Sequence, residues 1–431
     1  MTKRVIIIGT DGLRPDAFDP QLMPCYARLA EQGARYLDFR AAYPPHTRVN
    51  MATLTTGVRP GRHGVVGNVM LVPGAGQGDL VDTSRAEHLL EFEARTGRPF
   101  LLAPALGDRL ERHGRRLGVV ASSSPGASLL WNPKRPRQVI NPSSHYGQAD
   151  LMNLLDKLGD VPEERGRTRF ERARWATRAM IDLLLPDDAH QVITLWLSEP
   201  DNSQHFYGLG SPEAKEALQA VDACVAEVVA ALDRLGQRSQ TDLLLISDHG
   251  HATIETSRSL ADLLETAQQE LALELPLVAV GDFVYGKQGM DLPVEVLGRL
   301  SSWLFEQPWC DRVFAPEALG LTGVEPLEAM IGVIEHDRAP LLAVSASSSS
   351  EANAFGVPGM VEAITPYPQL KSSHGSTSRY EMQAFCLAVG PSFPEGVTFD
   401  EPCGTVDIAP TVCALLGYVE HGFDGRPLPV A

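Results

Sequence analysis

The sequence predicts an α/β protein with a mostly parallel central sheet that is flanked by helices. Several short apolar runs end in small or acidic residues, which is typical of strands buried on both faces. Helix-like patterns separate these runs, and this alternation favours a parallel sheet covered on both sides. The rhythm is lost over 256–369, which predicts an inserted, substrate-selecting cap subdomain on a catalytic core formed by 1–255 and 370–431.

The predicted elements follow one another along the chain as alternating strands and helices. Strands are expected at 5–12, 117–123, 192–201, 243–250 and 385–392, each as a buried parallel strand. Helices are expected at 23–33, 211–236 and 405–417, and the first and last of them close on a glycine. Within the predicted cap, the serine-rich stretch 345–356 is expected to form a flexible loop.

Composition and charge narrow the classes of function. The chain has 431 residues, of which 44% are hydrophobic and 21% charged, so it is long and apolar enough to bury a sizeable core. The formal net charge of −17 argues against a nucleic-acid polymer as partner, because gripping a phosphate backbone needs clustered Lys and Arg. A small anionic substrate would therefore need local metal ions or a few arginines.

Cysteine spacing and the N-terminal segment bear on the cellular compartment. The six cysteines lie far apart without any CxxC spacing, which favours free thiols over a zinc ribbon or a disulfide framework. The apolar run near the N-terminus is too short for a signal-peptide core or a membrane span. The sequence thus predicts a cytoplasmic location and no membrane span.

Three acidic residues follow directly on predicted strands. Asp11, Asp201 and Asp248 should emerge at the carboxyl edge of the sheet, where ligands of open α/β sheets bind. Histidines accompany two of them, because His205 lies four residues after Asp201 and His249 follows Asp248. Carboxylate and imidazole groups together suit zinc. Each residue also has a structural interpretation, such as capping of a helix near Leu13 by Asp11, but the coincidence of three strand ends favours a metal site.

The candidate metal ligands extend to two further residues, a threonine and a histidine. The full set is Asp11, Thr47, Asp201, His205, Asp248, His249 and His374. The roles of His46 and His251 stay open, because each lies beside a candidate ligand and either could support one. His63 is expected to order a turn or to contact a strand-end carboxylate.

Five motifs give the chain a family resemblance. They are IIIGTDGLRPD at 6–16, TRVNMATLTTGVRPGRHGVVGN at 47–68, EPDNSQHFYG at 199–208, SDHGH at 247–251 and SHGS at 373–376. With these motifs in this order, the sequence resembles the alkaline phosphatase superfamily and, within it, the type I phosphodiesterase/nucleotide pyrophosphatase family. The resemblance implies an alkaline-phosphatase-like sandwich with an inserted cap.

The resemblance also implies roles for individual residues. Asp11, Asp248 and His249, with the hydroxyl of Thr47, would hold one zinc ion, and Asp201, His205 and His374 would hold a second. Manganese or iron could occupy the same ligands. Thr47 would be the nucleophile. Asn50 would donate to a phosphoryl oxygen, assisted by the backbone N–H of Thr47.

The implied function is a two-metal hydrolase that cleaves small phosphate diesters through a covalent phospho-threonine intermediate. The chain departs from the family pattern at His46, Arg48 and Val49, where Lys and Phe-Pro are usual, and at Ser376 and Thr377, where Tyr-Asp is usual. Arg48 is a candidate substrate-binding residue. If its side chain points inward it favours phosphomonoesters, and if it points to solvent it favours diesters.

Other functions remain as alternatives. A phosphomonoesterase or a phosphonate hydrolase of the phosphonoacetate type would use the same ligands. A metal-bound, non-catalytic binding protein is less favoured, because the ligand set and the nucleophile are all present.

Overall fold

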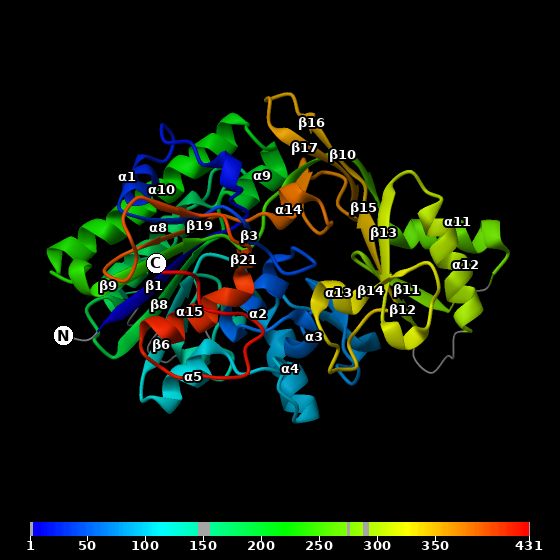
Figure 1. Cartoon of the computed structure of the whole chain (residues 1–431), viewed down its shortest axis with the longest axis horizontal. Helices are drawn as coiled ribbons and strands as arrows, with labels where there is room; N and C mark the ends of the chain where they lie inside the picture. The colour runs from blue at the N-terminus through cyan, green and yellow to red at the C-terminus, as the bar shows by residue number, and fades with distance from the viewer. Residues whose placement is uncertain (1–2, 145–155, 274–275, 288–292, 431) are drawn as a thin grey trace.

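The computed structural model describes residues 3–144, 156–273, 276–287 and 293–430. An eight-stranded sheet forms its centre, helices flank both faces of this sheet, and a smaller α/β part lies at one end, at the right of Figure 1. The central strands, in their spatial order, are β20 (Val397–Phe399), β2 (Gly33–Tyr36), β19 (Cys386–Val389), β9 (Thr241–Ile246), β1 (Arg4–Thr10), β8 (His190–Leu197), β6 (Arg116–Ala121) and β7 (Val139–Ile140).

The middle of the sheet is buried on both faces, as the apolar runs predict. In β1 the side chains of Val5 and Ile7 join the hydrophobic cluster on one face, and those of Ile6 and Ile8 join the cluster on the other. This division follows from the two-residue period of a strand. All four side chains are fully buried, so the strand anchors both layers of the core.

Two sets of helices cover the two faces. The first packs on the side of Ile6 and contains α1 (Pro24–Glu31), α8 (Phe170–Ala179) and α10 (Pro212–Arg234). The second packs on the side of Val5 and contains α2 (Thr47–Thr56), α4 (Ala86–Thr96), α5 (Leu106–Arg112), α6 (Pro125–Leu130) and α15 (Ile408–Leu415). Figure 1 shows both sets around the central strands. The α/β architecture predicted from the sequence is therefore confirmed.

Strand direction differs from the prediction at one place. β1, β8, β9 and β6 run parallel to one another, whereas β19 is antiparallel to both of its neighbours, β2 and β9. The prediction that residues 385–392 form a parallel strand is thus wrong in direction. A strand buried on both faces has the same apolar pattern in either direction, so the sequence pattern does not distinguish the two.

A further hydrophobic cluster with its own sheet lies within the segment predicted as a cap. The sheet has the order β11 (Leu277–Val280), β12 (Phe283–Gly286), β15 (Leu342–Ala346), β13 (Cys310–Ala315) and β14 (Glu325–Pro326). Its buried side chains pack against α11 (Leu260–Leu271) and α12 (Val294–Phe305). This cluster draws its buried residues only from 260–344, so the segment has a core of its own.

A four-stranded sheet links this segment to the central part. Its order is β16 (Ser348–Ala352), β17 (Pro358–Ile364), β10 (Ala252–Arg258) and β18 (Ser372–Ser373). β10 spans the boundary predicted at 255/256. The predicted loop at 345–356 is wrong in part, because β16 is an edge strand that pairs with β17. All of its side chains are exposed, which gives the strand the composition of a loop.

The remaining elements are short and lie near the edges of these layers. They are β3 (Phe39–Arg40), α3 (Pro60–His63), β4 (Val69–Leu71), β5 (Leu80–Asp82), α9 (Asp201–Tyr207), α13 (Leu327–Ile331), α14 (Arg379–Met382) and β21 (Cys403–Gly404). All six cysteines are free thiols. Among the described residues, no helix combines the length and the apolar character that a membrane crossing requires.

Candidate active site

The three strand-end acids meet at the carboxyl edge of the central sheet. β9, β1 and β8 are adjacent and parallel, so their carboxyl ends lie side by side. Asp11 follows β1, Asp248 lies two residues after β9, and Asp201 begins α9 after β8. Backbone hydrogen bonds connect the loops, because Asp11 N–H donates to Leu197 O (3.0 Å) and Asp201 N–H donates to Asp11 O (3.1 Å).

Thr47, Asp11, Asp248 and His249 form one group, which we call the Asp248 cluster. Its centre is His249 Nε2, which lies 3.1 Å from Thr47 Oγ1, 3.3 Å from Asp248 Oδ2 and 3.5 Å from Asp11 Oδ1. His249 Nδ1–H donates to the carbonyl of Gly250 (2.9 Å), which leaves a lone pair on Nε2. With this tautomer, Thr47 Oγ1–H donates to Nε2, and the two facing carboxylate oxygens lie close to the same nitrogen.

The two carboxylates of the Asp248 cluster each have one oxygen without a hydrogen-bond partner. Asp11 Oδ2 accepts from Trp196 Nε1–H (3.1 Å), and Asp248 Oδ1 accepts from the N–H of Gly12 (3.2 Å). Asp11 Oδ1 and Asp248 Oδ2, the oxygens that face His249, are buried and unpaired. Burying a charged group without a partner raises the free energy of the folded protein, and a bound cation would offset this penalty. The donor set thus fits a metal ion.

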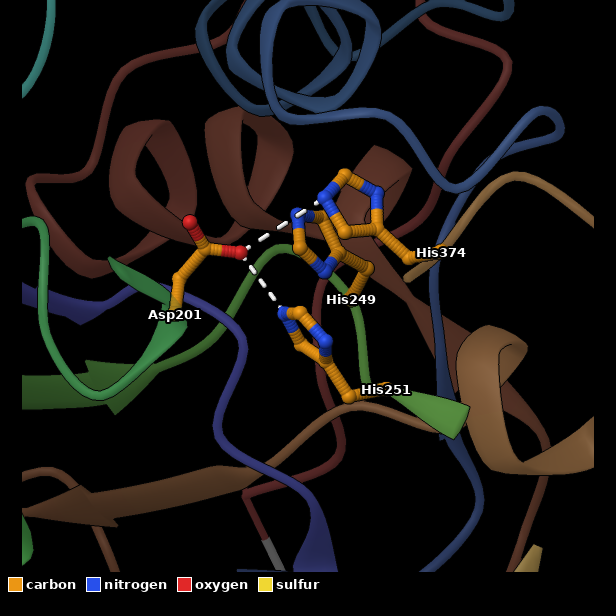
Figure 2. A group of neighbouring side chains, drawn as sticks. All are labelled: Asp201, His249, His251 and His374. Carbon is orange, nitrogen blue, oxygen red and sulfur yellow. Dashed lines mark hydrogen bonds and ion pairs between the residues drawn. The ribbon is translucent and has the colours of Figure 1, made fainter. Parts of the chain in front are cut away.

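Asp201, His205, His251 and His374 form the second group, the Asp201 cluster. Asp201 Oδ1 is faced by three imidazole nitrogens, namely His251 Nε2 at 2.7 Å, His205 Nε2 at 3.4 Å and His374 Nε2 at 3.5 Å. Figure 2 shows the His251 and His374 rings directed at this oxygen. α9 places Asp201 and His205 four residues apart, which puts them on the same helix face.

Hydrogen bonds fix the orientation of two of these rings. His205 Nδ1–H donates to Ser372 O and His374 Nδ1–H to Pro45 O, both at 2.7 Å. Their Nε2 lone pairs then face a carboxylate oxygen, an arrangement that a cation between them would stabilise. A metal-bound histidine commonly donates its other ring N–H in this way. The Asp201 cluster also fits a metal ion.

Burial and repulsion between carboxylates shape the acid–base properties of both clusters. Burial, together with the charge of Asp248, holds the pKa of Asp11 well above its usual value, and burial also raises the pKa of Asp248. For Asp201, burial acts in the same direction, but the charges and hydrogen bonds of His205 and His251 together outweigh it and hold the pKa well below its usual value. Close carboxylates that resist ionisation together are stabilised by a nearby cation.

Buried glutamates hold the backbone that carries the histidines. Glu381 Oε2 accepts the N–H groups of Gly375 and Ser376, both at 2.7 Å, directly after His374. Glu199 accepts the N–H of Ser203 at 3.0 Å, within the first turn of α9. Burial raises the pKa of each of these two carboxyl groups to about 7. Both segments are therefore positioned by side chains that lie outside the two clusters.

Comparison with known proteins places the chain in a family. The family model for type I phosphodiesterase/nucleotide pyrophosphatase matches residues 5–289. The chain belongs to this family. Among curated family members, the chain is 28% identical to ectonucleotide pyrophosphatase/phosphodiesterase family member 7 of Mus musculus over 438 residues, covering 98% of this chain and 85% of that protein. It is 26% identical to member 1 of Homo sapiens over 251 residues, which cover 58% of this chain and 24% of that protein.

A solved structure of a family member has the same fold. Murine ectonucleotide pyrophosphatase/phosphodiesterase 5, in an inactive threonine-to-alanine form in complex with AMP, superposes with a TM-score of 0.67 at 18% identity. The match covers 99% of this chain and 98% of that one. The chain thus has the alkaline-phosphatase-like fold that the sequence predicts. The family is metal-dependent. Two groups of side chains are close enough together to hold a metal ion, and they share His249: Asp11, Asp248 and His249, and Asp201, His249, His251 and His374.

The structure contradicts the expectation for Asn50. Its amide group is fully buried and fully hydrogen-bonded, because Oδ1 accepts from Ala42 N–H (2.7 Å) and Thr405 Oγ1–H (2.9 Å). Nδ2 donates to the carbonyls of Ala42 and His46 (3.1 and 3.2 Å). No donor remains for a phosphoryl oxygen, so Asn50 instead ties the start of α2 to the preceding loop.

Asn68 is a second asparagine close to Thr47. Its Oδ1 accepts the N–H of Arg48 (3.2 Å), which places the amide beside the residue that follows Thr47. Its carbonyl is held by Thr83, through the backbone N–H (3.0 Å) and the hydroxyl (2.7 Å). Asn68 is half-buried. The available signal was its place at the end of the 47–68 motif.

His251 is one of the two histidines whose roles the sequence leaves open. It is fully buried, with Nε2 at 2.7 Å from Asp201 Oδ1 and Nδ1 at 3.1 Å from Ser372 Oγ. Gly12, with φ of +68°, leaves room for it, because a Cβ atom there would lie 2.8 Å from His251 Cδ2. His251 therefore belongs to the Asp201 cluster and is one of the side chains there that could hold a metal ion.

His46 connects the nucleophile helix to the inserted segment. It precedes Thr47, and its Nε2 lies 3.2 Å from Oδ2 of Asp282, between β11 and β12. Its ring also stands edge-on to Phe283, with the ring centroids 6.5 Å apart. The inserted segment thus reaches the residue next to Thr47.

Proposed function

We propose that this protein is a metal-dependent hydrolase of small phosphate diesters that uses Thr47 as its nucleophile. The main observation behind this proposal is that three oxygen atoms lie around His249 Nε2. They are Thr47 Oγ1 and the unpaired carboxylate oxygens of Asp11 and Asp248. Membership of the phosphodiesterase/nucleotide pyrophosphatase family supports the same reaction class.

The metal requirement is part of this proposal. The Asp248 cluster would hold one divalent ion and Asp201, His205 and His374 a second, with zinc as first choice and manganese or iron as alternatives. Two such ions supply Lewis-acid chemistry, in that they favour the alkoxide of a bound hydroxyl and neutralise charge on the phosphoryl group. The buried unpaired carboxylate oxygens and the bare Nε2 atoms support this assignment.

The reaction proceeds in two displacements on phosphorus. In the first, Thr47 Oγ loses its proton and forms a bond to phosphorus, while the bond from phosphorus to the leaving alcohol breaks and that oxygen takes up a proton. In the second, a water oxygen bonds to phosphorus and the bond to Thr47 Oγ breaks, which restores the hydroxyl and releases a phosphate monoester. Splitting one difficult displacement into two is the advantage of a covalent intermediate.

The start of α2 orients the phosphoryl group in this proposal. Thr47 is the first residue of the helix, where backbone N–H groups without helical partners and the helix dipole favour an anion. The amide of Asn68, beside Arg48, would donate to a non-bridging oxygen. Asn68 replaces Asn50 in this role, because the donors of Asn50 are already occupied.

The first test is the effect of Thr47→Ala on hydrolysis of an aryl phosphodiester. We expect kcat/KM to fall by about a thousandfold or more, since the nucleophile is removed. Metal content, measured by elemental analysis, should persist because the carboxylates and imidazoles remain. Thr56→Ala is the matched control, since the Thr56 hydroxyl donates to Ala52 O within the same helix. Turnover by Thr47→Ala at the wild-type rate would refute the proposal.

A further inference from the structure

Arg48 directly follows Thr47 in α2, and its Nε is buried. Its charge interacts with that of Asp82, at the end of β5, and with those of Asp11, Asp201 and Asp248 in the two clusters. His205, from the Asp201 cluster, also lies within range of its charge. The buried Nε and these charge interactions favour the inward orientation considered from the sequence.

The guanidinium of Arg48 has no partner among the residues that the structure describes. Within the described part of the chain, the guanidinium forms no ion pair and no hydrogen bond with another side chain, and the backbone N–H of Arg48 donates to Asn68 Oδ1. Nε is buried without an acceptor, while the residue as a whole remains partly exposed. Buried arginines are normally paired with carboxylate or phosphate oxygens, so this one is available to an anion that enters the site.

Two other cationic residues of the described chain, Lys371 and Arg14, are less suited to bind an anion at this site. Lys371 is near in the sequence to His374, but its side chain is exposed and its backbone N–H is bonded to His205 O (2.7 Å). Arg14, which is buried near His251, already donates to the carbonyl groups of His251 (3.1 Å) and Pro358 (2.8 Å) and pairs with Asp16. Arg48 differs from these two residues because its guanidinium has N–H donors without an acceptor.

We propose that this site also hydrolyses phosphate monoesters and that Arg48 confers this second activity by binding the additional charged oxygen. A diester phosphoryl group carries one negative charge and a monoester carries up to two, so the monoester has an extra oxygen to neutralise. The inference rests on the proposed function, because it uses the same nucleophile. Thr47 Oγ bonds to phosphorus as the alcohol leaves, and water then breaks the Oγ–phosphorus bond and releases inorganic phosphate.

The experiment compares kcat/KM for an aryl phosphomonoester and the matching aryl phosphodiester in the metal-loaded protein. Arg48→Met keeps an unbranched side chain as far as the position of Nε and removes the charged guanidinium. We expect the ratio of monoester to diester kcat/KM to fall by about tenfold to a hundredfold, as for loss of a hydrogen-bonded charge. Arg48→Lys should recover part of the ratio, since it restores the charge without the planar fork.

Arg62→Met is the matched control, because Arg62 is a partly exposed arginine that pairs with Asp424. The ratio should stay at the wild-type value in this variant. Thermal unfolding of each variant separates a binding effect from a loss of fold.

The outcomes separate this inference from the proposed function. Diester turnover with no detectable monoester turnover would overturn the inference alone. An equal fall of both activities in Arg48→Met would overturn it too, and would indicate that Arg48 contributes equally to both reactions. Absence of turnover of either ester by the wild-type protein would refute the proposed function itself.

Discussion

At the scale of single residues, two asparagines near Thr47 have opposite roles. Asn50 uses its whole amide group to tie α2 to residues 42–46 and to Thr405. In Asn68, both the side-chain and the backbone carbonyl oxygen accept hydrogen bonds, and the side-chain amide lies beside the backbone of Arg48. The first is thus a structural residue, and the second is the one we expect to contact substrate.

Alanine substitutions should separate these roles. We expect Asn68→Ala to lower kcat/KM for an aryl diester by about tenfold to a hundredfold at little cost in stability, since one donor to a charged oxygen is lost. Asn50→Ala should lower the free energy of unfolding by about 1–3 kcal/mol, because buried groups lose their partners. Kinetics and urea unfolding measure the two effects. The reverse pattern, with an intact Asn68→Ala enzyme, would return the phosphoryl contact to Asn50.

The residue types of the site could be predicted from the sequence, but their interactions only in part. Because Asp11, Asp201 and Asp248 each follow a strand, the sequence alone predicts that they lie close together. The sequence held no information on which hydrogen bonds a side chain makes, so the occupied amide of Asn50 was not foreseen. For the same reason His251 remained ambiguous, because its contact with Asp201 arises from a turn after β9.

At the scale of elements, a short helix and its turn are organised by a buried histidine. His63 ends α3 and is fully buried. Its Nδ1 accepts the N–H of Val65 (3.2 Å), and Nε2–H can then donate to Thr53 Oγ1 (3.0 Å) on α2. This pattern requires the neutral ring. The expectation that His63 orders a turn agrees with this geometry.

The neutral state of His63 makes a prediction about pH. Burial, together with the charges of His336 and Arg338, holds its pKa well below the usual value. A histidine with a depressed folded-state pKa contributes stability above about pH 6.5, the unfolded value, and that stability is lost as pH falls towards the folded value. We expect the unfolding free energy of the wild type to fall more steeply below pH 6.5 than that of His63→Gln, by up to about 1.4 kcal/mol per pH unit.

Urea unfolding of both proteins between pH 7 and pH 5 measures this difference. Parallel pH profiles for the two proteins would contradict the neutral, buried state of His63.

The elements themselves were predictable to the extent that their apolar patterns are distinctive. β1, β6, β8 and β9 are long, central and buried on both faces, and each was expected within a few residues. β19 was expected as a strand but in the wrong direction, because its neighbours decide direction. β16 was missed, since an exposed edge strand has no apolar side to detect.

At the scale of the whole molecule, the site lies where three parts of the chain meet. The central sheet supplies the acids, α2 supplies Thr47, and the inserted segment approaches through the contact of Asp282 with His46. The segment has its own hydrophobic cluster, while β10 and β17 link it to the central part (Figure 1). The loss of the α/β rhythm in the sequence predicts an insertion here, and this prediction is compatible with the separate cluster. The contact of the segment with His46 could not be predicted, because it depends on how the two parts pack.

The central claim is that Thr47, one of four threonines in α2, is the nucleophile, and the most direct test is to trap the covalent intermediate. Metal-loaded protein would be mixed with an aryl phosphodiester, quenched in acid during turnover, digested and analysed by mass spectrometry. We predict a phosphoryl ester on Thr47, and none on Thr53, Thr55 or Thr56. A modified residue other than Thr47, or turnover by Thr47→Ala at the wild-type rate, would contradict the account.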